Sequence, residues 1–389
     1  MKGRWKASEE NHQKKYLFFD LLNTGHHYQY NLAVMKGVLK GAPSSEVTYY
    51  SSGLEESRQA ELEAAGISYQ RAVERRYHRY MPSMLVRALL LLQVLRFAYK
   101  HKSVLHLLYL DTLIIPLVFL IPALRGMKIT ATLHWYPPRE SKRRLLRNLL
   151  RRQHLDKLIV HGDYLRKQVL ELTSVEQSRV SSIVYPNLHP AVVQETVQAP
   201  GTHASQGAAE SVPTLLCFGG LRYDKGIDLL LEAAGRLSSQ PFSILVAGRE
   251  QDFTRGDLEQ IIRDKGLEHK VELCLEYIPD HEVPLYFERA DIIVLPYRKM
   301  FSGQSGPLTE AAARGKVIIG PSHGEIGYCI ERYGLGVSFR AEDISDLGDK
   351  IVYAIHNMDE LRRKSQSSEY KALLSPGIFE QRYFEELAG

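Results

Sequence analysis

The strongest constraint on the fold is an alternation of strand and helix patterns that runs through the sequence twice. Short apolar runs are predicted strands, and the amphipathic stretches between them are predicted helices. The predicted strands are Tyr16–Phe19, Val47–Tyr50, Val104–Leu107, Ile129–Leu133, Leu158–Val160, Ser182–Val184, Thr214–Phe218, Phe242–Ala247, Val271–Leu275, Ile292–Leu295, Val317–Ile319 and Val337–Phe339. The predicted helices include His27–Leu39, Leu54–Ala65, Pro82–Lys100, Glu140–Gln153, Asp228–Leu237, Asp257–Lys265, Glu282–Arg289, Pro307–Arg314 and Ile344–His356. This alternation favours parallel sheets covered by helices on both faces.

The alternation lapses once, in a segment of residues 195–213 that is rich in Ala, Gly, Ser, Thr, Gln and Pro. We therefore predict an α/β protein with two Rossmann-like domains whose ligand lies at the carboxyl ends of the strands, in a cleft between them. The predicted boundaries are an N-terminal domain at 1–194, a linker at 195–212, a C-terminal domain at 213–375 and a final helix at 376–389 that packs back on the first domain.

Charge is divided unevenly between the two halves. Residues 1–190 hold 29 Lys and Arg against 15 Asp and Glu, whereas residues 191–389 hold 21 against 30. A basic N-terminal half favours an anionic lipid surface or a phosphorylated acceptor. Nucleic acid is not expected as a partner, because no aromatic-basic recognition motif accompanies the charge.

Cysteine usage and hydropathy indicate a cytoplasmic protein. The three cysteines lie far apart and form neither a disulfide framework nor a zinc motif. The first residues lack the apolar core of a secretory signal. Residues 105–124 form the one long apolar stretch, but His106, Asp111, Pro116 and Pro122 interrupt it, so we expect a strand, a turn and a helix there instead of a membrane span.

The first informative motif runs from Cys217 to Asp228. An apolar strand ends at Gly219 and Gly220, and a short loop carrying Arg222 and Lys225 leads into a helix. Glycines permit close approach of a ligand, and the two cations are suited to binding a diphosphate. A surface turn with two solvated cations is the alternative interpretation.

The second motif follows the strand that ends at Pro296. Four small residues, Ser302, Gly303, Ser305 and Gly306, precede Pro307, which is suited to the first turn of a helix. The N–H groups and dipole at such a helix start can hold a phosphate. Glu310, one turn inside, could accept hydrogen bonds from two adjacent hydroxyls such as those of a ribose. The alternative is a tight turn with a capping carboxylate.

Together with the segment Tyr277–Tyr297 between them, these motifs closely resemble the retaining glycosyltransferases of family 4, which have the GT-B fold. The resemblance covers nearly all of residues 213–340. It implies that Arg222 and Lys225 bind the donor diphosphate as catalytic residues, without a metal, and that Glu310 grips the ribose. It further implies that Gly219, Gly220, Ser302, Gly303, Ser305, Gly306, Pro307 and Leu308 line the donor, and that Tyr277 and Ile278 pack on the nucleobase, with UDP favoured over GDP.

Two positions depart from the family pattern. Ser302 stands where the family has the first glutamate of its Glu–seven residues–Glu motif, and Gly220 stands where it usually has an arginine. Arg222 is expected to compensate for the second change. These departures support an alternative function, a catalytically inactive GT-B subunit that binds within a polysaccharide assembly complex. A dinucleotide-dependent oxidoreductase is disfavoured, because the chain contains no Gly-x-Gly-x-x-Gly.

The N-terminal half resembles the family less. Gly25, His26 and His27 resemble the family's glycine-containing loop beneath the acceptor. His134 follows a predicted strand, where the family often has a catalytic histidine that faces the donor sugar. Each histidine could equally be an ordinary packed or solvated residue.

Residues 140–153 predict a basic amphipathic helix. Leu145, Leu146, Leu149 and Leu150 form one stripe, and the cations around it are Lys142, Arg143, Arg144, Arg147, Arg151 and Arg152. A second basic region comprises Arg75, Arg76, Arg79, Arg87 and Arg96. Such a helix could bind an anionic membrane peripherally through 142–152, on its inner face, or simply bury its leucines in its own domain.

The resulting prediction is a metal-independent, retaining transferase. No Asp-x-Asp triplet occurs in the chain, so cations and a helix start would stabilise the leaving diphosphate. The expected substrates are a nucleotide sugar and a glycan or lipid-linked acceptor, in the synthesis of cell-surface polysaccharide or glycoconjugate.

Overall fold

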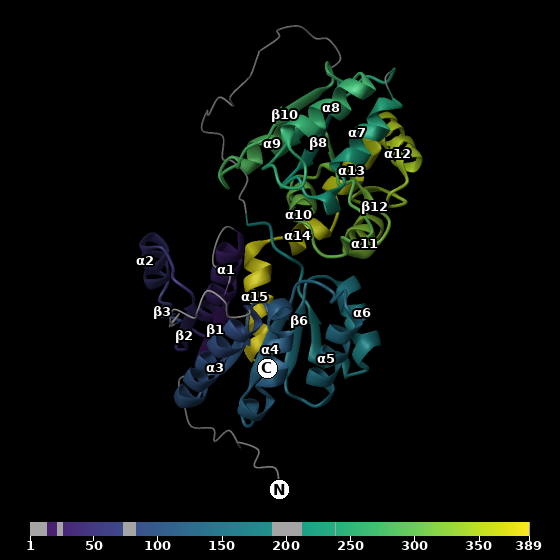
Figure 1. The fold of residues 1–389 in the computed structure, drawn as a ribbon. Coiled ribbons are helices and arrows are strands. Elements are labelled where there is room, and N and C mark those ends of the chain that lie inside the picture. Colours follow the sequence, from purple (N-terminus) through teal and green to yellow (C-terminus); the bar gives the residue numbers. More distant parts are fainter. Residues whose placement is uncertain (1–13, 22–25, 73–82, 189–211, 238, 389) are drawn as a thin grey trace. The chain divides into compact units, whose positions relative to one another are not determined.

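The computed structural model describes residues 14–21, 26–72, 83–188, 212–237 and 239–388. The chain divides into two compact units, unit 1 with residues 1–188 and 376–389 and unit 2 with residues 189–375 (Figure 1). Unit 1 contains a parallel sheet in the order β3-β2-β1-β4-β5-β6-β7, and unit 2 contains one in the order β10-β9-β8-β11-β12-β13. The predicted α/β class with two helix-covered parallel sheets is confirmed. Of the predicted linker, residues 195–211 lie outside the described residues.

The elements of unit 1 alternate strictly along the chain until its last helix. Its strands are β1 (Lys15–Asp20), β2 (Glu46–Ser51), β3 (Ser68–Arg71), β4 (Val104–Leu107), β5 (Ile129–Leu133), β6 (Lys157–Val160) and β7 (Val180–Ser182). Its α-helices are α1 (His26–Gly41), α2 (Glu56–Ala64), α3 (Ser83–His101), α4 (Ile114–Phe119), α5 (Glu140–Arg151), α6 (Asp163–Thr173) and α15 (Pro376–Ala388). Short 3₁₀ helices occupy η1 (Leu110–Thr112), η2 (Ile121–Leu124) and η3 (Gln177–Arg179).

Unit 2 repeats the alternation around a smaller sheet. Its strands are β8 (Thr214–Phe218), β9 (Ser243–Ala247), β10 (Val271–Cys274), β11 (Ile292–Val294), β12 (Val317–Pro321) and β13 (Gly336–Phe339). Its helices are η4 (Tyr223–Lys225), α7 (Ile227–Gly235), α8 (Arg255–Lys265), α9 (Val283–Arg289), α10 (Gly306–Ala313), α11 (Gly324–Tyr333), α12 (Ile344–His356), α13 (Met358–Gln366) and α14 (Tyr370–Leu373).

The sequence pattern located most of these elements within two residues, with informative exceptions. Strand β3 was not predicted, because Ser-Tyr-Gln-Arg contains no apolar run. Strand β7 lies two residues before the predicted Ser182–Val184. Helix α11 was also missed, since two glycines in its first turns lower its helix propensity. Residues 105–124 do form a strand followed by short helices, and no described helix is both long and apolar enough to cross a membrane.

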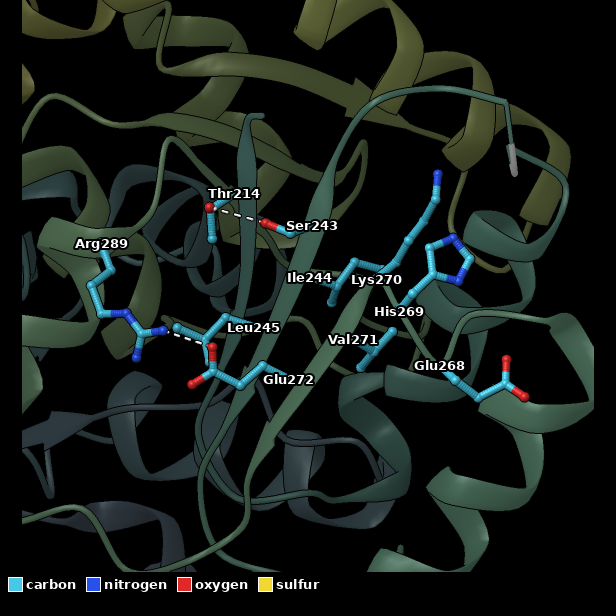
Figure 2. Close-up of a pocket in the computed structure, with 10 residues that line it drawn as sticks. All are labelled: Thr214, Ser243, Ile244, Leu245, Glu268, His269, Lys270, Val271, Glu272 and Arg289. Carbon is cyan, nitrogen blue, oxygen red and sulfur yellow. Dashed lines mark hydrogen bonds and ion pairs between the residues drawn. The ribbon is translucent and has the colours of Figure 1, made fainter. Parts of the chain in front are cut away.

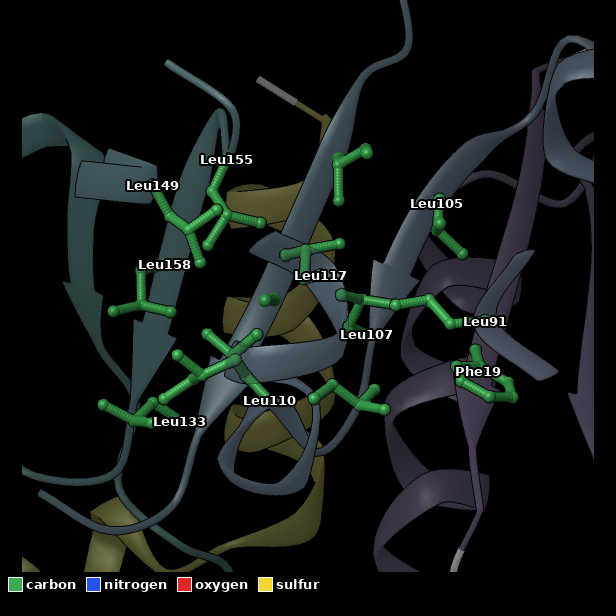
Figure 3. Packing of buried hydrophobic residues seen from close by; sticks show 14 of the residues in the cluster. Phe19, Leu91, Leu105, Leu107, Leu110, Leu117, Leu133, Leu149, Leu155 and Leu158 are labelled. Carbon is green, nitrogen blue, oxygen red and sulfur yellow. The ribbon is translucent and has the colours of Figure 1, made fainter. Parts of the chain in front are cut away.

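The sheet of unit 1 buries both faces, as the two-residue period of its strands requires. Leu17 and Phe19 of β1 point into one apolar cluster, and Tyr16 and Phe18 point into another. The first cluster packs against α3, α4, α5 and α6, and Figure 3 shows its leucines interdigitating around Leu107, Leu110 and Leu117. The second packs against α1 and α15. The two clusters therefore pack on opposite faces of the same strand.

Helices α1 and α15 pack closely because glycine faces the contact. A Cβ at Gly37 would overlap the backbone of Glu380, and a Cβ at Gly41 would overlap the Phe384 ring. Salt bridges flank the contact, from Lys40 to Glu380 at 2.5 Å and from Lys157 to Glu386 at 2.7 Å. The last helix is thus an integral part of unit 1.

A buried hydrogen-bond chain connects α15 to the sheet. It runs from Thr130 through His106, Thr132, Tyr383 and Tyr30 to His161 and the carbonyl of Ile183. Burial lowers the pKa of His106 to about 3 and that of His161 to about 4, so both rings are neutral at neutral pH. Because the Ile183 carbonyl can only accept, His161 Nδ1 donates to it, and every hydroxyl in the chain must then donate in the same direction.

In unit 2 the corresponding core lies beneath α7, α8, α12 and α13. Leu215, Cys217, Val246 and Val294 project from the sheet into this cluster. Helices α10 and α11 contact β12. The cysteines Cys217, Cys274 and Cys329 are all free thiols, as predicted.

We predict opposite effects of one substitution at two helical glycines. Gly37→Ala should destabilise the chain by about 1–3 kcal/mol, because the new methyl group overlaps α15. Gly348→Ala in α12 should instead stabilise it by up to about 1 kcal/mol, since a Cβ at this position would have no neighbour within 4 Å and alanine favours helix. Urea unfolding of both variants measures the effects, and a stable Gly37→Ala protein would contradict the close packing.

Candidate functional site

The first motif forms a turn at the carboxyl end of β8. Gly219 follows the strand with a φ of +112°, and Gly226 caps α7 with a φ of +62°. Both conformations favour glycine. A Cβ at Gly226 would also overlap the carbonyl of Pro296, at the end of the neighbouring strand β11. The glycines therefore allow the turn to lie against the chain that follows β11.

Lys225 places its ammonium group inside this turn. A Cβ at Gly219 would come 2.5 Å from Lys225 Nζ, and Nζ lies 5.7 Å from the centre of the Tyr297 ring. Burial, with a smaller contribution from the charge of Arg222, lowers the pKa of Lys225 to about 8. Within the part of the chain that the structure describes, Lys225 forms no ion pair with a carboxylate.

Arg222, in contrast, has a carboxylate of its own. Its Nε and Nη2 donate to the two oxygens of Asp224 at 2.9 and 2.5 Å. This bidentate pair orients the guanidinium at the mouth of the turn and leaves its remaining N–H groups for another acceptor. The two cations thus differ, because Arg222 pairs with a carboxylate and Lys225 pairs with none of the described carboxylates.

Arg298, which the sequence analysis did not single out, holds the turn in place. This buried side chain bonds Asp228 at 2.5 and 3.0 Å and the carbonyl of Tyr223 at 2.6 Å, and it stacks 3.8 Å from the Tyr223 ring. Asp252 accepts the N–H of Tyr223 at 2.8 Å. Charged side chains therefore hold both the N–H and the carbonyl of Tyr223.

The second motif forms the predicted helix start. Ser305 caps α10, and its hydroxyl lies 3.3 Å from the Tyr297 hydroxyl. The N–H of Leu308 is bonded to Ser305, and Pro307 has no N–H, so the donors left for an anion are chiefly the Gly306 N–H and the hydroxyls. Tyr297 thus joins both motifs, because Lys225 lies over its ring and Ser305 meets its hydroxyl.

Glu310 is buried one turn inside α10, where it pairs with Arg314 on the next turn. Arg314 also reaches Glu288 at 3.5 Å. The sequence analysis expected this carboxylate to face a ligand and did not anticipate its arginine partner. Spacing of four residues on a helix is the signal that would have indicated the pair.

Ser302 and Gly303 lie in the loop before α10, and α11 braces this loop. The N–H of Glu325 donates to the Ser302 carbonyl at 3.2 Å, and a Cβ at Gly324 would press on the Ser302 backbone. His323 Nε2 bonds the Phe301 carbonyl at 3.1 Å. Where the family has a glutamate, this chain therefore has a short side chain on a braced backbone.

The remaining residues that were predicted to line the donor lie farther along the same edge. Gly220 approaches the side chain of Gln251, whose atoms would lie about 3.0 Å from a Cβ there. Tyr277 is exposed and Ile278 is buried, at the carboxyl end of the edge strand β10. This position is two strands away from β8, so no described contact joins Tyr277 to the Lys225 turn.

The predicted residues of unit 1 are only partly described. Gly25 and the side chain of His26 lie outside the described residues. His27, on α1, meets the Tyr109 ring edge to face at 5.3 Å. His134 follows β5, stacks on Tyr109 at 4.5 Å and bonds the Leu108 carbonyl through Nε2 at 3.0 Å. These rings form one cluster at the carboxyl end of the sheet.

Helix α5 buries three of the four leucines that could have entered a membrane, and the fourth, Leu145, is partly buried against the same core. Leu146, Leu149 and Leu150 are buried in the core of unit 1, while Arg144 and Arg152 are exposed. Arg75, Arg76 and Arg79 of the second basic region lie outside the described residues.

One surface hollow lies away from this site. A pocket of about 330 Å³ is lined by residues at the starts of β8, β9 and β10, including Thr214, Ser243 and Val271 (Figure 2). An ion pair of 2.7 Å between Arg289 and Glu272 borders it. Because it lies at the amino ends of the strands, it is separate from the two motifs.

Among the described residues, no group of three or more His, Cys, Asp or Glu could hold a metal.

Comparison with known protein families gives a match within unit 2. Residues 212–357 match the family described as glycosyl transferases group 1. A 76-residue segment is 37% identical to the GDP-mannose:cellobiosyl-diphosphopolyprenol alpha-mannosyltransferase of Xanthomonas oryzae pv. oryzae. That segment is 19% of this chain and only 20% of the length of that relative.

Solved structures resemble the whole chain in fold. Alr3699/HepE of Anabaena in complex with UDP has a TM-score of 0.70 at 15% identity, covering 97% of this chain and 100% of that one. A glycosyltransferase from Rickettsia africae has a TM-score of 0.68 at 16% identity, with coverage of 97% and 99%. The shared architecture is the GT-B fold.

Lys225→Met should stabilise the chain at neutral pH, because it removes a desolvated charge that pairs with no carboxylate in the part of the chain that the structure describes. The pKa of Lys225 is about 8 when folded and 10.5 ordinarily, so between these values the unfolded chain binds more protons and wild-type stability rises with pH. The gain in melting temperature should therefore be largest below pH 8 and shrink towards pH 10. Lys299→Met, which removes an exposed lysine nearby, is the control. An equal shift in both variants, or one independent of pH, would refute the desolvated ammonium.

Proposed function

Since residues 212–357 match the glycosyl transferases group 1 family and the chain has the GT-B fold, we propose that this protein transfers a sugar from a nucleoside-diphosphate sugar to an acceptor hydroxyl. The observation that carries the proposal is the meeting of Lys225, Arg222 and the α10 start around Tyr297. An ammonium that none of the described carboxylates pairs with, beside a glycine turn and a helix start, is an arrangement suited to a diphosphate.

In the proposed reaction the diphosphate is the leaving group. The bond between the anomeric carbon and the phosphate oxygen breaks, and the acceptor oxygen bonds to that carbon. The acceptor proton passes to the departing phosphate. Lys225 and Arg222 stabilise the charge that develops on this phosphate, which is a task that fixed cations perform without a metal. Attack on the face that the leaving group departs from would retain the anomeric configuration, as in family 4.

The rest of the donor is assigned along the same edge of the sheet. Glu310 would bind the ribose, with Arg314 fixing the orientation of its carboxylate. Tyr277 and Ile278 would contact the nucleobase, which we expect to be uracil. Ser302 and Gly303 would lie near the sugar, where the braced backbone offers no carboxylate. HepE, a structural neighbour, is described in complex with UDP, and the Xanthomonas relative is named for GDP-mannose.

We assign the acceptor to unit 1 and propose a lipid-linked glycan at the inner face of a membrane. The Xanthomonas relative is named for a diphosphopolyprenol-linked acceptor, and the basic character of residues 1–190 is compatible with one. Because the leucines of α5 are buried, membrane contact would be electrostatic and would use arginines such as Arg144 and Arg152.

Lys225→Ala should lower turnover by roughly 100-fold or more, because it removes a charge that acts in the transition state. The donor is first identified by thermal shift with UDP-, GDP- and ADP-sugars, since a ligand that binds the folded chain raises its melting temperature. Release of nucleoside diphosphate then measures turnover, and Lys299→Ala is the control. Turnover by the Lys225 variant at the wild-type rate would reject the assignment, and nucleotide binding without any turnover in the wild type would favour the inactive subunit.

The membrane proposal predicts flotation with anionic liposomes that depends on salt. Replacing Arg144, Arg147 and Arg152 together with glutamine should abolish flotation at about 0.1 M salt, since each cation near an anionic surface contributes about 1 kcal/mol. A matched variant replaces Arg263, Arg340 and Lys364 of unit 2 with glutamine and removes the same charge. If both variants float as the wild type does, α5 is not the contact.

A further inference from the structure

Beyond the residues assigned so far, one carboxylate controls the turn that carries His134. Asp111 lies in η1, after β4, and reaches the end of the neighbouring strand β5. Its Oδ2 accepts the N–H of His134 at 3.0 Å, and its Oδ1 accepts the N–H of Trp135 at 2.8 Å. Both carboxylate oxygens are therefore used by consecutive peptide groups of one turn.

The side chains of this turn are tied to the same segment. His134 donates from Nε2 to the Leu108 carbonyl and stacks on Tyr109, and a hydrogen bond joins the Trp135 indole to the Tyr109 hydroxyl. Lys142 of α5 donates to the carbonyl of Asp111 itself at 3.2 Å. Residues 108–111 and 134–135 thus form a single block, the aromatic turn block, at the carboxyl end of the sheet of unit 1.

We propose that Asp111 is a positioning residue that sets the place of the His134–Trp135 turn and thereby the binding of the acceptor. This inference rests on the proposed assignment of the acceptor to unit 1. The side chains of His134, Trp135 and Tyr109 in the aromatic turn block are partly exposed. Asp111 is also partly exposed as a residue, but its carboxylate is desolvated and both of its oxygens accept N–H groups of the turn. Asp111 therefore acts through the turn and does not itself touch the substrate.

The charge of Asp111 matters because two N–H groups require two accepting oxygens. A protonated carboxyl group, or an asparagine, offers one good acceptor and leaves one N–H poorly bonded. Desolvation raises the pKa of Asp111 to about 6, although hydrogen bonds from His134 and Trp135 and the charge of Lys142 act in the opposite direction. Other titratable groups also face this region: Tyr109 and Asp20, the ring of His134 itself, and the rings of His27, His161 and Tyr30 that contact Tyr109 or His134. The turn should therefore loosen as pH falls through about 6.

Trp135 reports on the turn directly. The chain has two tryptophans, so Trp5→Phe leaves Trp135 as the sole indole. In that background the emission of Trp135 should change with pH around a midpoint near 6, the pKa of Asp111, and Asp111→Asn should hold it at the low-pH value throughout. Emission in Asp111→Asn that titrates as in the Trp5→Phe parent would overturn the proposal.

Kinetics separate positioning from general stability. The assay uses the donor identified above, and its acceptor is the member of a panel of octyl glycosides to which the wild type transfers sugar fastest. In this assay Asp111→Asn should raise the acceptor KM by roughly tenfold and leave the nucleotide affinity within about twofold of wild type. The acceptor KM of the wild type should rise as pH falls below about 6, the pKa of Asp111, and the acceptor KM of Asp111→Asn should not change over this range. Asp111→Ala should raise the acceptor KM further.

Asp156→Ala is the matched control. Asp156 Oδ2 accepts the N–H of Ile129 at 2.7 Å, so this variant removes a similar bond from the opposite end of the same strand β5. It should lower the melting temperature without moving the acceptor KM. If both variants raise the acceptor KM alike, or neither does, Asp111 has no positioning role. Failure of the wild type to bind any nucleotide sugar would instead overturn the proposed function, and the Trp135 emission would still decide whether Asp111 holds the turn.

Discussion

The proposed donor site depends on one ammonium group, that of Lys225, which the fold desolvates and which pairs with no carboxylate among the described residues. Asp224 is bonded to Arg222 and Asp228 is bonded to Arg298, and neither acid forms an ion pair with Lys225. A desolvated cation next to a glycine turn costs stability. An anion that enters the turn would supply the missing negative charge. The arrangement therefore lowers the stability of the unliganded protein but favours the binding of an anion.

Such a group is effective only if the turn beneath it is fixed. Arg298 bonds the carbonyl of Tyr223, and Asp252 bonds its N–H, so charged groups hold this peptide segment from both sides. Gly219 and Gly226 supply the backbone shape, and the Arg298–Asp228 pair supplies the rigidity. The cation thus lies on a preorganised support, which reduces the ordering that ligand binding would otherwise require.

The sequence was sufficient for the alternation, the sheet class and the glycine-led turns, because these depend on local periodicity and on φ angles that glycine favours. It was insufficient for partners that are distant along the chain. Arg298 and Asp228 are 70 residues apart and meet only because β11 lies beside β8. The Glu310–Arg314 pair was within reach of spacing rules, yet its role depends on burial that the sequence does not display. Strand β3 was not predicted, because its extended conformation depends on backbone pairing with β2 and not on its own composition.

The two units solve the same physical problem with different sets of charged side chains. A parallel sheet brings every strand's carboxyl end to one edge, where the following turns have unpaired peptide groups. In unit 2 Arg298 bonds the carbonyl of Tyr223 and Asp252 bonds its N–H, whereas in unit 1 Asp111 alone bonds two consecutive N–H groups. The arginine keeps its charge at any relevant pH, but the desolvated carboxylate does not, since its pKa is about 6. It follows that acidification through about pH 6 should loosen the turn of unit 1, while Arg298 keeps the charge with which it bonds the Tyr223 carbonyl.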